Sequence, residues 1–155
     1  MQSSDFDTMT AMELRGRIAR REVSPVEVAR RALDKAAATQ GSLNAFFVLM
    51  PEQALAAAKA AEEAVMRGDP LGLLHGVPFS AKDLIAIGGE RFAFGSRCMA
   101  DNIAAADAPS VERAKRAGGI LIGKTTTSEF GCKAVGDSPL TGICLLYTSP
   151  SPRDS

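Results

Sequence analysis

Apolar residues recur along the chain with two different spacings. Four segments repeat them every three or four positions, which is the pattern of an amphipathic helix, and three shorter segments are continuously apolar, as buried strands are. The predicted order is a helix beginning at Thr10, a helix over 24–41, a strand over 43–50, a helix over 51–68, a strand over 76–87, a helix over 107–118 and a strand over 120–122. This alternation predicts an α/β domain with a largely buried sheet.

Start and stop signals agree with this order. The run 10–13, Thr-Ala-Met-Glu, has the form of a capping box, and Ser24 precedes a proline that would occupy the first helical position. Gly41 is expected to end the second helix and Gly68 the third. Asp107 is expected to cap the start of the last helix.

Composition narrows the functional classes. The 155 residues include 18 basic and 18 acidic side chains, so the formal net charge is zero. This balance argues against a surface that coats nucleic acid. The polar N-terminus does not look like a signal peptide, and no run approaches the roughly 20 apolar residues of a membrane span. We therefore expect a cytoplasmic protein with no membrane partner.

Cysteine and histidine are too few and too scattered to suggest a metal site. Cys98, Cys132 and Cys144 show no short paired spacing, and the chain has one His. An odd number of cysteines without such spacing, together with a single His, predicts reduced thiols, no disulfide framework and no zinc site. We expect no metal and no cofactor.

The stretch 76–87 is an apolar segment with two charged residues in its middle, Lys82 and Asp83. In an extended chain Ser80 and Lys82 share one face and Asp83 points to the other. An ammonium is expensive to desolvate, so Lys82 must be paired, reach solvent or serve chemistry. One interpretation is a buried structural ion pair or a capping role for Asp83. The other is a desolvated Lys82 that acts as a general base, since burial favours a neutral amine.

The run 118–125 formally matches the phosphate-binding pattern G-x-x-x-x-G-K-[ST]. That loop needs a strand before its first glycine and a helix after its lysine. Here the strand-forming residues 120–122 lie inside the motif, and the first two glycines follow a helical segment. The pattern therefore favours a helix end followed by a strand, without nucleotide binding.

Several blocks in this order and spacing resemble the amidase signature family, over nearly all of residues 8–143. The blocks are Gly76–Leu84, Phe94–Ser96, Ala100–Asn102, Asp107-Ala108 and Gly123–Gly131. The resemblance implies the N-terminal part of the amidase signature fold, a mixed sheet flanked by helices.

Members of this family hydrolyse carboxylic amides, or transfer the ammonia released, through a Ser–cis-Ser–Lys triad. By resemblance, Lys82 is the catalytic lysine, which relays a proton through a bridging serine to the nucleophile. The residues around Lys124 and Glu129 would lie near the site without a chemical step. The family often has Asn where this chain has Thr126, a difference that bears on substrate preference.

Both serines of the family lie in a Gly/Ser-rich block that this sequence does not contain. We nominate none of Ser80, Ser96, Ser110, Ser128 and Ser138 as the nucleophile, because none of them is in that context. We therefore expect a chain truncated before the catalytic serines and inactive alone. The expected partner is a small-molecule amide, and the full-length enzyme could be a homo-oligomer.

Two alternatives remain open. One is the A subunit of the tRNA-dependent amidotransferase that acts on Asp-tRNA(Asn) or Glu-tRNA(Gln), which would have protein and nucleic-acid partners. The other is a non-catalytic interaction module in which Lys82 is only structural. The amidotransferase shares the family signature, so the residues here do not decide between it and a free-standing amidase.

The last residues, 144–155, differ in character from everything before them. They form a Ser/Pro-rich run that suits a disordered tail, and their reverse translation also resembles a transposase adapter used to prepare sequencing libraries. We therefore divide the chain into an amidase portion, 1–143, and a non-native tail, 144–155. A sheet cut part-way would expose an apolar edge, so self-association is expected.

Overall fold

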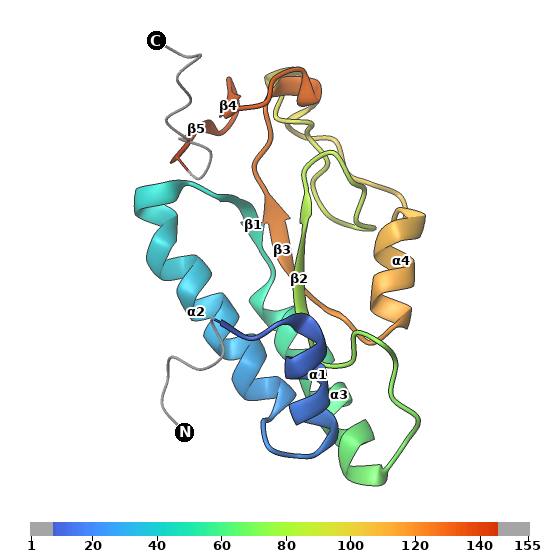
Figure 1. Ribbon diagram of the computed structural model, residues 1–155. Helices are drawn as coiled ribbons and strands as arrows, with labels where there is room; N and C mark the ends of the chain where they lie inside the picture. The colour runs from blue at the N-terminus through green and yellow to red at the C-terminus, as the bar shows by residue number, and fades with distance from the viewer. Residues whose placement is uncertain (1–7, 146–155) are drawn as a thin grey trace.

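The computed structural model describes residues 8–145 (Figure 1). The elements are α1 (Ala11–Ala19), α2 (Pro25–Leu43), β1 (Phe46–Leu49), α3 (Pro51–Arg67), β2 (Pro78–Lys82), η2 (Arg97–Met99), α4 (Pro109–Arg116), β3 (Ile120–Thr125), η3 (Glu129–Gly131), β4 (Gly136–Ser138) and β5 (Gly142–Cys144). The order from α1 to β3 is the predicted one. The two short 3-10 helices, η2 and η3, and the hairpin β4–β5 were not predicted, because three-residue elements carry no periodicity.

A three-stranded mixed sheet lies at the centre of the fold, with strand order β1-β3-β2. The middle strand β3 runs antiparallel to β1 and parallel to β2. The polypeptide between β2 and β3 contains α4, so these elements form a β-α-β crossover. The mixed sheet flanked by helices confirms the predicted fold class.

Helices cover the sheet on both faces, as Figure 1 shows with α2 and α4 on opposite sides. Ile120 and Ile122 of β3 pack against α2 and α3, whereas Leu121 packs in a cluster with Val111 of α4. The alternation follows from the two-residue period of a strand. Burying each of these side chains contributes about 1.5–3 kcal/mol to the free energy of unfolding.

Two of the predicted helix starts are confirmed in detail. The Thr10 hydroxyl accepts a hydrogen bond from the Glu13 amide, and the Glu13 carboxylate accepts one from the Thr10 amide. The Ser24 hydroxyl accepts from the amides of Val26 and Glu27. Each cap provides acceptors for amides that have no partner inside the helix.

The end of α2 and the start of α4 differ from the prediction. The helix continues past Gly41 to Leu43, and Asn44 ends it in a left-handed conformation with φ of 50°. Asn tolerates this conformation better than most residues, so it can replace glycine as the terminator. The N-cap of α4 is Ala108, without a side-chain hydrogen bond, while Asp107 accepts from the Gly88 amide and pairs with Lys115.

The strand predicted over 76–87 is shorter, because β2 stops at Lys82. The Ile85 amide donates to the Lys82 carbonyl, which closes a turn. Ile87 is nevertheless buried in the cluster that contains Ala81 and Leu121. Apolar residues after Lys82 therefore pack in the core although they do not belong to the strand.

The far end of the chain is described only as far as Leu145. Cys144 is buried and lies opposite Gly136 in the β4–β5 hairpin. Residues 146–155 lie outside the described residues, so the division into 1–143 and 144–155 stays a prediction. Among the helices in the described part of the chain, none is both long and apolar enough to cross a membrane.

Candidate active site

The carboxyl ends of the two parallel strands lie side by side, with Lys82 of β2 opposite Thr125 of β3. The carboxyl ends of strands in open α/β sheets are where ligand-binding crevices form. The segment after β2 and the segment after β3 both continue from this edge. The candidate site is therefore the surroundings of Lys82, the one residue that the sequence nominated.

Lys82 is half-buried, which corrects the expectation of an ammonium enclosed in the sheet interior. Within residues 8–145 its side chain has neither a hydrogen bond nor an ion pair. The burial pattern of the strand agrees with the predicted faces: Ser80 is exposed, while Ala81 and Asp83 are buried. Lys82 and Ser80 therefore lie on the more accessible face of β2, and Ala81 lies on its buried face.

The enclosed lysine is Lys124, on the neighbouring strand, with 0% of its surface exposed. Its ammonium lies 2.7 Å from a carboxylate oxygen of Asp83, which is 1% exposed. It also donates to the backbone carbonyl of Arg91 and lies 5.0 Å from the centre of the Phe92 ring. The buried structural ion pair that the sequence left open exists, but Asp83 forms it with Lys124.

Asp83 also fixes the loop that follows. Its two carboxylate oxygens accept hydrogen bonds from the amides of Ala93, at 3.3 Å, and Gly95, at 3.2 Å. These amides flank Phe94, so one buried carboxylate holds the backbone on both sides of that residue. A Cβ at Gly95 would lie 2.7 Å from the Thr127 carbonyl oxygen. Glycine is required there by the close approach of two backbones.

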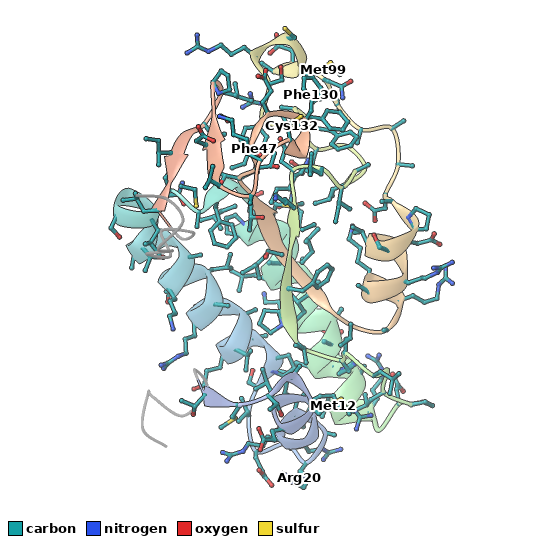
Figure 2. The ribbon with its side chains drawn as sticks, turned by 45° about the horizontal axis from the view of Figure 1, so that its top comes forward. Met12, Arg20, Phe47, Met99, Phe130 and Cys132 are labelled. Carbon is teal, nitrogen blue, oxygen red and sulfur yellow. The ribbon has the colours of Figure 1, made fainter. Side chains whose placement is uncertain are left out.

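An aromatic cluster stands over this edge of the sheet. The rings of Phe92 and Phe94 have centres 4.1 Å apart, and those of Phe94 and Phe130 are 5.8 Å apart. The Phe130 amide donates to the Phe94 carbonyl, and both residues have a positive φ, near 50°. Figure 2 shows Phe47, Phe130 and Cys132 at this end of the molecule, with Met12 and Arg20 at the opposite end.

Backbone of this kind is strained. Non-glycine residues at positive φ cost roughly 1–3 kcal/mol each and occur most often at functional sites. Phe94 and Phe130 keep this conformation because their backbones hold each other and Asp83 holds the amides around Phe94. Two of the four non-glycine residues at positive φ within residues 8–145 therefore lie near the sheet edge that carries Lys82.

The serines near this edge make hydrogen bonds elsewhere. Ser96 is fully buried and donates to Glu129 at 2.7 Å, Ser128 donates to the Lys133 carbonyl, and Ser138 bonds to Thr141. Within the described part of the chain no serine is hydrogen-bonded to Lys82. These contacts hold η3 and the β4–β5 hairpin in place.

The phosphate-loop interpretation is excluded by the position of the motif. Gly118, with φ of 89°, follows the end of α4, and residues 120–125 form β3. The lysine of the motif is Lys124, which is buried against Asp83. The residues between the two glycines of the motif are therefore strand, and they form no loop of free amides that could surround a phosphate.

The role of Lys124 was the main omission of the sequence reasoning. The apolar run 120–122 predicted a strand buried on both faces, and Lys124 follows it after one glycine. A lysine that continues such a strand needs a buried acid, and Asp83 was the acidic residue in the other apolar stretch. Pairing the two required knowing that the strands are adjacent.

The mixed sheet flanked by helices is the fold class that the resemblance to the amidase signature family implies. Residues 27–145 match the profile of the Amidase family, which is more than half of the chain. The protein therefore belongs to the Amidase family.

Individual relatives agree. The acylamidase of Rhodococcus erythropolis is 37% identical over 142 residues, which cover 92% of this chain and 30% of the relative. The A subunit of the glutamyl-tRNA(Gln) amidotransferase of Geobacter sulfurreducens is 36% identical over 134 residues, covering 86% of this chain and 27% of the relative. The chain thus spans less than a third of the length of these relatives.

Solved structures give the same fold. A bacterial aryl acylamidase of the amidase signature family superposes with a TM-score of 0.83 at 26% identity, covering 88% of this chain and 29% of that one. The peptide amidase of Stenotrophomonas maltophilia superposes with a TM-score of 0.81 at 26% identity, covering 90% of this chain and 30% of that one.

Proposed function

We propose that this chain is the lysine-bearing part of an amidase that hydrolyses a carboxylic amide through a Ser–cis-Ser–Lys triad, with Lys82 as the base. One observation carries the proposal. Lys82 stands half-buried at the carboxyl edge of the sheet with no partner in residues 8–145, while the neighbouring carboxylate of Asp83 is occupied by Lys124. Lys82 is therefore available for chemistry, and Lys124 is not.

In the proposed reaction the side chain of Lys82 acts as the base. It accepts a proton from a bridging serine, which accepts one from the nucleophilic serine, and the nucleophile attacks the amide carbon. The same relay returns the proton to the departing nitrogen, which leaves as an amine or ammonia. Water then cleaves the acyl-enzyme ester to give the carboxylic acid. The substrate is a small-molecule amide, and no metal or cofactor enters the reaction.

The nucleophile and the bridging serine are absent from this sequence in the family's Gly/Ser-rich context. The 155-residue chain should therefore not hydrolyse a simple aryl amide, because no acyl-enzyme can form. Hydrolysis by the pure chain that disappears on Lys82→Ala would overturn this expectation.

The role of Lys82 is tested in a chimera. Residues 8–143 replace the matching segment of the Rhodococcus erythropolis acylamidase, whose own remainder supplies the rest of the site. Lys82→Ala in this chimera should lower kcat by about 10²–10⁴-fold, the usual contribution of a positioned acid–base group. The melting temperature should change little, because the Lys82 side chain has no partner in the described part of the chain.

Lys59→Ala is the matched control for this experiment. Lys59 is exposed on α3, so its removal should leave both kcat and the melting temperature unchanged. A chimera that is active with and without Lys82 would contradict the assignment of the base and favour the interpretation of Lys82 as a structural residue.

A second candidate is the A subunit of a tRNA-dependent amidotransferase. It is supported by the 36% identity to the Geobacter sulfurreducens protein, which nearly equals the 37% identity to the acylamidase. The same segment placed in the Geobacter protein would be assayed for transfer of ammonia to the aminoacyl-tRNA in the assembled enzyme. Activity in the acylamidase chimera alone favours the free-standing amidase.

A further inference from the structure

We propose that the buried Asp83–Lys124 pair is a positioning device that aligns Lys82 and the loop over it, and that its role is in turnover more than in stability. The inference rests on the proposed function, because it assigns a purpose to the residues that adjoin the base. It concerns two charged residues that take no part in proton transfer.

The pair joins three pieces of backbone at one point. Asp83 is bonded through its peptide to Lys82, and its amide donates to the Thr125 carbonyl at 3.0 Å, which ties the end of β2 to the end of β3. Its carboxylate holds the amides of Ala93 and Gly95. Lys124 lies on β3, pairs with Asp83 and donates to the Arg91 carbonyl, so it connects this strand and the backbone at Arg91 to the same point. The direction in which Lys82 leaves the sheet is thereby fixed relative to the aromatic loop.

Stability alone does not account for a pair in this place. Taking two charges out of water costs about as much as their attraction returns, so apolar side chains of similar volume often serve as well or better. The region around the pair is already apolar, with Phe92 against Lys124. What an apolar pair cannot supply is a set of directed hydrogen bonds to Ala93, Gly95 and Arg91, and these define a single loop geometry.

The loop geometry can be measured in the 155-residue chain without any assay of activity. Amide hydrogen exchange is followed by NMR in the unchanged chain and in the double variant Asp83→Asn with Lys124→Met, which leaves no buried charge unpaired. We expect exchange at the Ala93 and Gly95 amides to accelerate at least about tenfold, while the amides of β3 that bond to β2 remain protected. A uniform acceleration across the sheet, or no change at Ala93 and Gly95, would contradict a local anchor.

The effect on turnover is measured in the acylamidase chimera with three variants, namely Asp83→Asn, Lys124→Met and the two combined. Each single variant leaves one buried charge unpaired, so both the melting temperature and kcat should fall. The combined variant has no unpaired charge and should recover most of the melting temperature. We expect its kcat to remain at least about tenfold low, with KM within about threefold of the unchanged chimera.

Val65→Ala is the control for stability. Val65 is buried in the cluster formed by α1, α2 and α3, away from the sheet edge, and its truncation should lower the melting temperature without lowering kcat. Recovery of kcat together with the melting temperature in the combined variant would overturn the proposal and leave the pair purely structural. Failure of the proposed function appears separately, as activity that survives Lys82→Ala.

Discussion

Lys82 and Lys124 lie on adjacent parallel strands near the same edge, and their surroundings assign them different roles. Lys124 is enclosed, and an enclosed ammonium without a counter-charge would cost several kcal/mol. Asp83 removes that cost and is itself satisfied by two amides. Lys82 keeps partial exposure and needs no such arrangement. Lys82 has no ion pair within residues 8–145, and for this reason we propose Lys82 as the base and not Lys124.

The packing around a second single residue, Gly123, predicts the effect of a substitution on stability. It lies in the middle of β3, where a Cβ would overlap with the Val48 carbonyl oxygen of β1. Gly123→Ala should therefore force the strands apart and lower the free energy of unfolding by about 1–3 kcal/mol, the range for overpacked sites. Urea unfolding followed by circular dichroism measures the change.

Gly41→Ala is the opposite case. Gly41 lies within α2, and a Cβ there meets nothing within 4 Å. The substitution should raise the free energy of unfolding by about 0.5–1 kcal/mol, because alanine loses less backbone entropy in a helix. A loss of stability at Gly41, or none at Gly123, would contradict the packing described for these two sites.

At the scale of elements, Asp107 connects the start of α4 to the loop after β2. It accepts a hydrogen bond from the Gly88 amide at 2.8 Å and pairs with Lys115 at 2.7 Å. Partial burial alone would raise the pKa of Asp107, but the hydrogen bonds from Lys115 and Gly88 outweigh it and hold that pKa below its ordinary value near 3.8. This carboxylate is thus more acidic in the folded chain than in the unfolded one.

A pH dependence follows from that direction. The unfolded chain binds the proton first as the pH falls, so the contribution of Asp107 is complete above about pH 4 and is lost below it. Asp107→Asn should remove this part of the acid loss of stability, measured by urea unfolding between about pH 2 and pH 6. Asp101→Asn, at an exposed position, should leave the profile unchanged. Identical profiles for the two variants would contradict the role of Asp107.

The link between α2 and the β4–β5 hairpin is also made by one residue. Asn44 ends the helix, and its side-chain amide donates to the carbonyls of Thr141 and Ile143. The hairpin therefore lies against the corner between α2 and β1, beyond the carboxyl end of β3 (Figure 1). The segment that follows β3 is thus held at two places: Ser96 bonds to Glu129 near its start, and Asn44 bonds to the β4–β5 hairpin near its end.

At the scale of the whole molecule, the sheet leaves open edges. Within residues 8–145 the strand β2 pairs only with β3, so its other edge has unpaired backbone groups. A groove of about 330 Å³ is lined mainly by apolar atoms of α2 and the sheet, including Val28, Ala32, Phe46, Pro78 and Ile122. An exposed edge together with an apolar groove favours association between copies.

We therefore expect the 155-residue chain to self-associate as its concentration rises, measured by sedimentation velocity. Ser80→Lys, at an exposed position of β2, should weaken the association because an edge charge opposes strand pairing. Ser110→Lys, at an exposed position of α4, should have no such effect. A single monomeric species at all concentrations with a sharp cooperative melt would contradict this expectation.

Much of the fold was predictable because it depends on local physics. Capping residues, the proline starts of α2 and α3, and the periods of the apolar positions each act within a few residues, and they placed the α-helices and β-strands from α1 to β3 in order. The end of α2 at Asn44 and the contacts of Asp107 were missed. Both residues bond to distant segments, at Thr141 and at Gly88, which no local pattern reports.

The sequence by itself determined the α/β class and the order of the elements. It also marked Lys82 as a charge in an apolar stretch, and the family resemblance nominated this residue as the base. The tertiary structure decided which lysine is buried and which acid it meets. The physical reason is that burial and ion pairing depend on which strands are neighbours, and β2 and β3 are brought together across 37 residues, from Asp83 to Gly119. Asp83 meets Lys124 because β2 and β3 are adjacent, whereas Lys82 lies on the other face of β2 and has no ion pair within residues 8–145.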